Sequence, residues 1–218
     1  MRHQGGWQHW LIMTAAVTPK GERRRYALVS AAADLLREGG FEAVRHRAVA
    51  RRAGLPLAST TYYFSSLDNL VENAVEHIGA MEAAQLRARV EALSRRRRGT
   101  EATADVLVDL LVGEPADAHV SEQLISRYER YIACARQPAL REIQRRLLHQ
   151  RVDAVVEAVS RSGRSVRPDL LTALVCAVDG AVVSALVADD DGPRDVARAT
   201  LVDVLDVLAP IDERTMRV

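Results

Sequence analysis

Apolar side chains recur every three or four residues along most of this 218-residue chain, and this spacing constrains the fold more than any other feature. The pattern is clear in residues 28–36, 67–81 and 170–186, where Leu, Val, Ile and Ala repeat at the period of one helix face. Between these segments lie glycines and prolines, which end helices. The breaks fall at Gly39-Gly40, Gly54, Gly113-Glu114-Pro115, Gln137-Pro138, Ser162-Gly163, Arg167-Pro168 and residues 189–193. The sequence therefore predicts an all-α protein of about nine helices.

Charge is distributed unevenly along the chain, although the net charge is only +1. Residues 1–66 hold ten Lys and Arg against four Asp and Glu, whereas residues 67–218 hold twenty basic and twenty-five acidic residues. A basic front on a slightly acidic body indicates a polyanionic partner for the front alone. One basic run, Arg95-Arg96-Arg97-Arg98, lies in the body. We interpret it as a solvated helix terminus, with DNA contact as the alternative.

The first 19 residues precede the first helical pattern and are interpreted as a flexible N-terminal arm. The apolar stretch at residues 10–17 resembles a short secretory signal, but a strongly basic amphipathic segment follows it directly. An overlong start, with Met13 as the initiator, is another interpretation, so it stays open whether residues 1–12 belong to the native protein. No stretch approaches the ~18 uninterrupted apolar residues of a membrane span. We expect a cytoplasmic protein without a membrane partner.

The residue types that usually carry catalysis or bind metals are scattered. The six histidines form no HExxH motif and no pair at ligand spacing, and GxSxG and glycine-rich phosphate-binding motifs are absent. Cys134 and Cys176 lie in apolar helical segments outside any CxxC motif. We interpret both as small buried hydrophobic residues, with a redox sensor as the alternative. The sequence therefore predicts no enzyme, catalytic residue, metal or cofactor, unless catalytic groups converge only in space.

The segment from Arg47 to Phe64 has the pattern of a helix-turn-helix. This motif needs a short helix, a tight turn and a second helix that enters the major groove of DNA. Gly54 can supply the positive φ of the turn, and the small Ala50 permits close approach of the two helices. The second helix carries a run of hydroxyl side chains, which can bind phosphates and base edges. A helical hairpin in an ordinary helical domain is the alternative.

Residues 24–71 resemble the DNA-binding domain of the tetracycline-repressor (TetR) family of transcription regulators. The resemblance rests on four motifs: Gly39-Gly40-Phe41, Val49-Ala50-x-x-Ala53-Gly54-Leu55, the run from Ser59 to Phe64, and Leu67-Asp68-Asn69-Leu70. It implies an N-terminal three-helix DNA-binding domain with a helix-turn-helix and a C-terminal, roughly six-helix domain for ligand binding and dimerisation. The expected domains are an arm at 1–19, a DNA-binding domain at 20–66 and an effector-binding and dimerisation domain at 67–218.

The resemblance also implies which positions contact double-stranded operator DNA. These positions are the start of the second helix and the third helix, namely Arg45, Arg47, Leu57, Ser59, Thr60, Thr61, Tyr62 and Tyr63. The chain departs from the family at two positions. Arg45 stands where the family usually has a Ser or Thr helix cap, and Leu67 stands where the family often has a phosphate-binding Lys. Both departures alter the expected phosphate contacts.

A symmetric homodimer would read two half-sites of a pseudo-palindromic operator. The two apolar helices near the C-terminus are the expected interface, with the pairing residues Leu174, Val178, Ala181, Ala185, Leu201, Val204 and Leu208. The alternative is that these helices form the core of one chain.

The body is expected to bind an unknown small-molecule effector that releases the repressor from DNA. The polar candidates for its pocket are Gln123, Tyr128, Tyr131, His149 and Asp179, each of which has a structural role as its alternative. An architectural DNA-binding protein without a ligand is a further alternative for the function. The sequence identifies neither the effector, the operator and the regulated genes, nor repression as opposed to activation.

Overall fold

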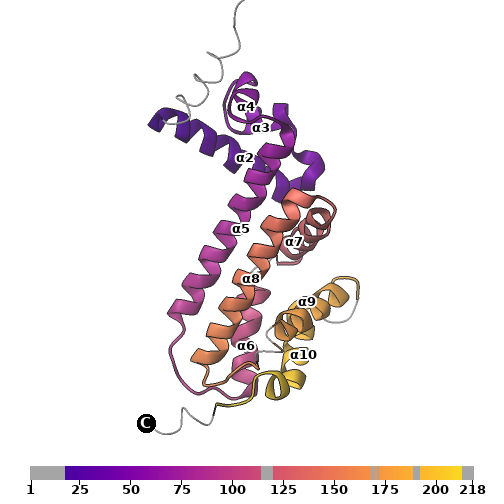
Figure 1. The fold of residues 1–218 in the computed structure, drawn as a ribbon. Coiled ribbons are helices and arrows are strands. Elements are labelled where there is room, and N and C mark those ends of the chain that lie inside the picture. The colour runs from indigo at the N-terminus through magenta and orange to yellow at the C-terminus, as the bar shows by residue number, and fades with distance from the viewer. Residues whose placement is uncertain (1–17, 114–119, 168–169, 171, 189–191, 213–218) are drawn as a thin grey trace, which may run out of the picture. The chain divides into compact units, whose positions relative to one another are not determined.

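The computed structural model describes residues 18–113, 120–167, 170, 172–188 and 192–212 (Figure 1). This part of the chain contains nine helices and no strand, so the all-α prediction is confirmed. Labelled as in Figure 1, the helices are α2 (Pro19–Ala43), α3 (His46–Arg52), α4 (Ala58–Tyr63), α5 (Leu67–Ala92), α6 (Thr100–Leu111), α7 (Val120–Ala135), α8 (Pro138–Arg161), α9 (Ala173–Ala185) and α10 (Pro193–Leu208). The predicted N-terminal arm lies almost entirely outside the described residues.

The first compact unit contains α2, α3, α4 and the part of α5 up to Ala80, together with Tyr128–Gln144 of α7 and α8. Its core consists of apolar residues from each of these elements, including Leu28, Ala32, Val49, Phe64, Leu70, Ile78 and Leu140. These positions recur at helical spacing because each helix buries one face against the others. Burying about ten such side chains, each contributing ~1.5–3 kcal/mol, gives the unit a stable scaffold.

The first helix begins one residue earlier than the sequence predicts, and the predicted glycine pair kinks it, while the helix continues to Ala43. Thr18 caps α2, because its Oγ1 accepts a hydrogen bond from the backbone N–H of Gly21 at 3.1 Å. Gly39 and Gly40 leave helical geometry, and Gly40 has a φ of +64°. A residue with a Cβ rarely adopts that conformation, so the pair separates the main helix from its last short turn.

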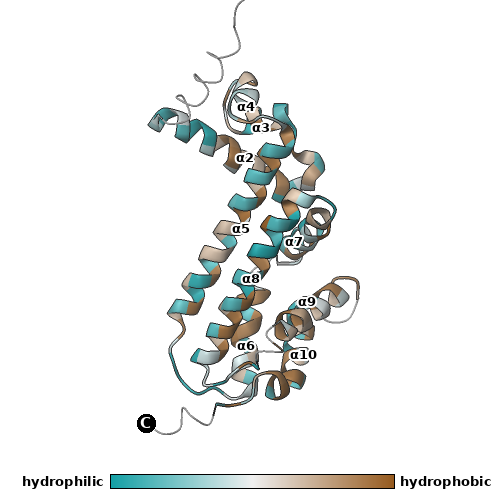
Figure 2. Cartoon of the chain, in the orientation of Figure 1, coloured by the Kyte–Doolittle hydropathy of each residue, from teal (hydrophilic) through white to brown (hydrophobic). Residues whose placement is uncertain are grey.

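The second compact unit contains α5 from Met81, α6, α7 up to Arg127, α8 from Arg145, and the helices α9 and α10. Helix α10 packs against α9 and α6, and Leu174, Val178, Leu201 and Leu205 are fully buried. Figure 2 shows that α9 and α10 are rich in hydrophobic residues. The boundary between the two compact units falls within α5, after Ala80. The predicted boundary at residue 66 separates a DNA-binding from an effector-binding domain, and it stays a prediction.

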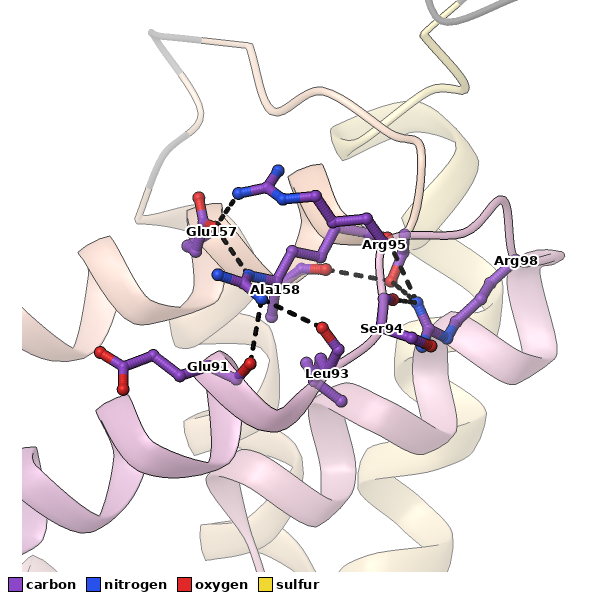
Figure 3. Close-up of polar contacts among 9 residues, drawn as sticks. Glu91, Leu93, Ser94, Arg95, Arg98, Glu157 and Ala158 are labelled. Atoms are coloured by element: carbon purple, nitrogen blue, oxygen red, sulfur yellow. Dashed lines mark hydrogen bonds and ion pairs between the residues drawn. The ribbon is translucent and has the colours of Figure 1, made fainter.

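The basic run at 95–98 joins two helix ends in the second unit (Figure 3). Arg161, the last residue of α8, donates hydrogen bonds to the carbonyl oxygens of Glu91 and Leu93 at 3.1 and 3.0 Å, at the end of α5. Arg98 donates in return to the carbonyl oxygens of Ser94 and Arg161, at 3.1 and 3.3 Å. Each helix end thus gains a cation where its carbonyl groups lack partners.

The interpretation of this run as a solvated terminus is therefore wrong for Arg98, which is only 7% exposed. Burial, and secondarily the charge of Arg96, lowers the pKa of Arg98 from its ordinary value. Arg95 remains exposed and pairs with Glu157 of α8 at 2.7 Å. The backbone carbonyl oxygens at the two helix ends explain why Arg98, alone among the four arginines, is buried.

Candidate nucleic-acid interface

The helix-turn-helix has the predicted glycine corner. Gly54 follows α3 with a φ of +64°, and its N–H donates to the carbonyl oxygen of Arg51 at 3.2 Å. The N–H of Leu55 donates to the carbonyl oxygen of Ala50 at 3.0 Å, which closes the turn. No atom lies within 4 Å of a Cβ built on Gly54, so the backbone conformation and not space requires glycine here. Ala50 is buried, as expected for a close helix approach.

Helix α4 exposes most of the predicted DNA-contacting side chains but buries one of them. Leu57, Thr61 and Tyr62 are exposed, and Ser59 and Tyr63 are half-buried. The rings of Tyr62 and Tyr63 meet edge to face, with centroids 5.0 Å apart. The hydroxyl of Thr61 donates to the carbonyl oxygen of Ala58 at 3.2 Å and still faces solvent.

Thr60 was predicted to contact DNA, and the structure corrects this prediction. Its exposed fraction is 0%, and its hydroxyl donates to the carbonyl oxygen of Leu57 at 2.8 Å. A six-residue helix must bury one face to stay folded, and a threonine can join that face when its hydroxyl bonds to the backbone one turn earlier. Thr60 therefore belongs to the scaffold of the recognition helix.

The sequence does not predict that Arg25 holds the end of α4. Phe64 is buried at the C-terminus of α4, and the guanidinium carbon of Arg25 lies 5.3 Å from its ring centroid. Arg25 also donates to the Oδ1 of Asn73, on α5, at 2.5 Å. Arg25 thus links α2, α4 and α5. Its place in a run of three arginines gave no signal of this role.

The cations around the motif divide into paired and unpaired groups. Arg52 forms two hydrogen bonds with the carboxylate of Glu38, at 2.8 and 2.6 Å, and they lower the pKa of that carboxyl group. Arg45 pairs with Glu42 and makes no side-chain cap of α3. Arg47 and Arg51 are exposed, and neither side chain has a hydrogen bond or ion pair among the described residues. Of the two predicted arginine contacts, Arg47 is therefore the better placed for a phosphate.

The residues predicted to pair in a dimer are mostly core of the single chain. Leu174, Val178 and Leu201 are fully buried without any partner, and Ala181 and Ala185 are nearly so. Val204 and Leu208 are half-buried. The prediction of Leu174, Val178 and Leu201 as interface residues is therefore wrong, because apolar periodicity marks a buried face and does not identify what covers it. The exposed positions of α9 and the turn after it are Cys176, Gly180, Val183, Ser184 and Val187.

The five predicted effector-pocket residues are divided between the two units. Tyr128 and Tyr131 belong to the first unit, half-buried and edge to face at 5.8 Å. Gln123 and His149 are exposed residues of the second unit. Asp179 forms an ion pair at 2.7 Å with Arg151, whose side chain is largely buried. A cleft of about 360 Å³ between α5 and α8 contains none of the five; its lining is Arg87, Val90, Glu91, Gln150, Asp153, Ala154, Glu157 and Arg161.

The two cysteines differ from one another, contrary to the prediction that both are buried. Cys134 is fully buried, and burial raises the pKa of its thiol to about 11. Cys176 is exposed on α9. Across the described ranges, no three His, Cys, Asp or Glu side chains are grouped so that they could hold a metal ion. The same ranges contain no helix with the length and apolarity needed to cross a membrane.

Two family profiles match the chain and cover both parts of it. Residues 28–74 match the family described as "Bacterial regulatory proteins, tetR family". Residues 98–207 match the family described as "Tetracyclin repressor-like, C-terminal domain". No curated protein matches the chain.

Solved structures support the same assignment. The multidrug binding protein EbrR, in complex with imidazole, is 30% identical over 83% of this chain and 94% of its own, with a TM-score of 0.62. The same protein has been solved with proflavin, malachite green and ethidium. The putative transcriptional regulator SCO7518 from Streptomyces coelicolor A3(2) is 26% identical, with a TM-score of 0.64, over 84% of this chain and 96% of its own.

A putative transcriptional regulator from Saccharomonospora viridis, in complex with choline, shares the fold with a TM-score of 0.65. It is 16% identical over 88% of this chain and 100% of its own, so this likeness concerns the fold alone. The family profiles cover most of the described chain, and the helix-turn-helix has the geometry that DNA binding needs. The chain belongs to the TetR family of DNA-binding transcriptional regulators.

Proposed function

We propose that this regulator is a repressor that binds a pseudo-palindromic operator as a homodimer and leaves it when a small-molecule effector binds. One observation carries the proposal: α4 and the residue before it expose Leu57, Thr61 and Tyr62, and the neighbouring helix α3 exposes the unpaired side chains of Arg47 and Arg51. Hydroxyl and apolar groups read base edges, and arginines neutralise phosphates. The proposal includes no catalytic activity and places the protein in the cytoplasm, where its operator DNA would lie.

A homodimer is proposed because one short helix reads few base pairs. Two copies related by a two-fold axis read two half-sites about one helical turn apart, or a multiple of it. The exposed face of α9 offers Gly180 and Ser184 for close approach, with Val183 and Val187 at 47% and 86% exposure as apolar surface. This face replaces Leu174, Val178 and Leu201 in the proposed interface. Val183→Asp is expected to yield monomers, and a stable dimer would place the interface elsewhere.

For the effector we propose an organic cation. EbrR has been solved with proflavin, malachite green and ethidium, and these three dyes are organic cations. Residues 67–218 carry five more acidic than basic residues, which favours a cationic ligand. A ligand that prefers the DNA-incompetent state weakens operator binding, typically by 1–3 kcal/mol, or about 5- to 150-fold.

The decisive experiment compares Tyr62→Ala with the matched variant Tyr26→Ala. Both residues are exposed tyrosines of the first unit, but Tyr26 lies on α2 against the ring of His77. Binding to the DNA beside the protein's own gene is measured by fluorescence anisotropy, and helicity by circular dichroism. Tyr62→Ala is expected to weaken binding about thirtyfold or more, since the change removes one interaction of at least ~1 kcal/mol from each half of the dimer. Tyr26→Ala is expected to bind normally.

Unchanged binding by folded Tyr62→Ala would contradict the assignment of α4 to the major groove. Binding without a discrete footprint would instead support an architectural DNA-binding protein. Ethidium and choline are the probes for release, with competitor DNA excluding an effect of ethidium on the duplex itself. A regulator that neither cation releases would refute the proposed effector class and leave DNA recognition intact.

A further inference from the structure

A cleft of about 450 Å³ opens in the first unit between the start of α2 and the recognition helix α4. Its lining from α2 and the residue before it is Thr18, Lys20, Gly21 and Arg24, and its lining from α4 and the preceding turn is Pro56, Ala58, Ser59, Tyr62 and Tyr63. No carboxylate lines the cleft. Two cations and several hydroxyl groups without an acidic side chain make a site for an anion.

Lys20 and Arg24 are the groups that give the cleft its charge. They lie four residues apart on one face of α2, both exposed, and neither has a hydrogen bond or ion pair among the described residues. Like charges at this spacing repel each other, and an anion between them removes that repulsion. The next residue, Arg25, is already engaged by Asn73 and the ring of Phe64. The chain therefore leaves Lys20 and Arg24 available and uses Arg25 internally.

The opposite wall connects this site to DNA recognition. Ser59 and Tyr62 come from α4, the helix proposed to enter the major groove, and their hydroxyl groups can donate to an anionic oxygen. An anion in the cleft would lie beside side chains that face the duplex. A backbone phosphate is the anion that a duplex supplies at such a position, since phosphates flank the major groove on both sides.

We propose that this cleft binds one operator phosphate, held by Lys20 and Arg24 and by the hydroxyl groups of Ser59 and Tyr62. The inference rests on the proposed operator binding and extends the DNA-contacting surface to the first turns of α2. Residues 19–27 precede the segment that matches the family profile, which begins at residue 28, so the profile assigns them no role.

The first test compares Arg24→Gln with Arg23→Gln. Both substitutions remove one exposed, unpaired cation from α2, but Arg23 does not line the cleft. The slope of log K against log [salt] is measured for operator binding by each full-length variant. Arg24→Gln is expected to make the slope shallower by about 0.9 for each phosphate that is no longer neutralised, or about 1.8 per dimer. Arg23→Gln is expected to keep the wild-type slope, and both variants should keep the wild-type thermal midpoint.

The second test finds the phosphate itself. Operators carrying a single neutral methylphosphonate at successive backbone positions are bound by wild type and by Arg24→Gln. We expect one position per half-site that weakens wild type but leaves Arg24→Gln unaffected, because that variant no longer binds the phosphate there. An unchanged salt slope, an equal change in Arg23→Gln, or methylphosphonate effects that are the same in both proteins would overturn the proposal.

The outcomes separate this inference from the proposed function. If Tyr62→Ala loses operator binding while Arg24→Gln behaves as wild type, the cleft is not a phosphate site and operator recognition stands. If folded Tyr62→Ala binds as wild type, the groove assignment fails first. In that case a salt-slope change in Arg24→Gln alone would still assign a phosphate to the cleft.

Discussion

Two arginine-rich regions of this regulator use the same side chain in opposite ways. In the first unit, Arg24, Arg47 and Arg51 are exposed and have no polar partner among the described residues. In the second unit, Arg98 and Arg164 are buried and donate to oxygen atoms of their own chain. The first group remains available to an external anion, whereas the second group donates to carbonyl oxygens at helix ends, as Figure 3 shows for Arg98.

The difference arises from what surrounds each guanidinium group. The arginines of the second unit meet helix C-termini, where up to four carbonyl groups lack partners inside the helix. Arg164 satisfies the carbonyl oxygen of Ala209 at 2.9 Å, after the end of α10, and bonds to Asp206 at 2.7 Å. The unpaired arginines of the first unit have no such acceptor. A guanidinium group is internal where the fold supplies acceptors and stays exposed to solvent where it does not. We propose that Arg24, Arg47 and Arg51 use this exposure to contact DNA.

The largest expected effect on stability is that of Arg164→Met. The substitution removes hydrogen bonds to the Oδ1 of Asp206, the carbonyl oxygen of Ala209 and the hydroxyl of Thr100, at 2.7, 2.9 and 2.8 Å. Loss of bonds from a buried charged donor predicts a decrease of about 2–4 kcal/mol in the free energy of unfolding. Chemical denaturation of full-length protein measures it. A loss below about 1 kcal/mol would remove the contrast between the two regions.

A smaller effect is expected from replacing the glycines that shape the two regions. Gly54 and Gly163 both have positive φ, at 64° and 74°. Alanine at Gly54 meets no atom within 4 Å, so only the backbone strain of ~1–2 kcal/mol applies. Alanine at Gly163 would also place its Cβ 3.3 Å from the Cα of Arg97. Thermal denaturation should show Gly163→Ala to be the more destabilising variant. The reverse order would show that the backbone around Arg97 and Gly163 adapts to a Cβ more easily than the turn at Gly54.

The sequence predicts the fold and the glycine corner because both depend on local rules. Periodic apolar residues require helices, and Gly54 requires a turn. It does not predict that Thr60 is buried, because a run of hydroxyl residues does not reveal the rotational phase of a six-residue helix. It also does not distinguish core from interface in α9. Val178 and Val183 are equally apolar in sequence, and only the packing of α10 and α6 decides which is covered.

Residue type alone predicts the effector-site candidates, and residue type carries no information on which side chains converge in space. Arg98 and Arg25 show the same limit for cations. Each lies in a run of arginines, and its role depends on acceptor atoms that are distant in the chain. These are the backbone carbonyl oxygen of Arg161 for Arg98 and the Oδ1 of Asn73 for Arg25.

A third prediction concerns how the ionisation of Asp206 changes stability with pH. We expect it to contribute less than about 1 kcal/mol to the free energy of unfolding, because the Asp206 side chain is mostly exposed. Two hydrogen bonds lower the pKa of Asp206 from its ordinary 3.8, and the bond from Arg164 has a larger effect than the bond from Thr100. The folded state therefore favours the charged carboxylate. Its contribution is complete above that ordinary pKa and is lost as the pH falls through the lower, folded-state value. Stability curves of wild type and Asp206→Asn should differ at pH 6 and converge as the pH falls below 3.8. A constant difference would exclude this ionisation as its source.

The smallest effect on stability is expected from Arg47→Ala. This variant tests the exposed arginines of the first unit, as Arg164→Met tests the buried arginines of the second. Arg47 is exposed and makes no polar contact within the described residues, so the free energy of unfolding should change by no more than ~0.5 kcal/mol. Its effect should appear only with DNA, as a salt slope shallower by about 0.9 for each phosphate left without its arginine. Arg164→Met is expected to show the opposite pattern, with a large loss of stability and, in protein that remains folded, an unchanged slope. If Arg47→Ala lost stability and kept its slope, the guanidinium group of Arg47 would stabilise the fold and would not contact a phosphate.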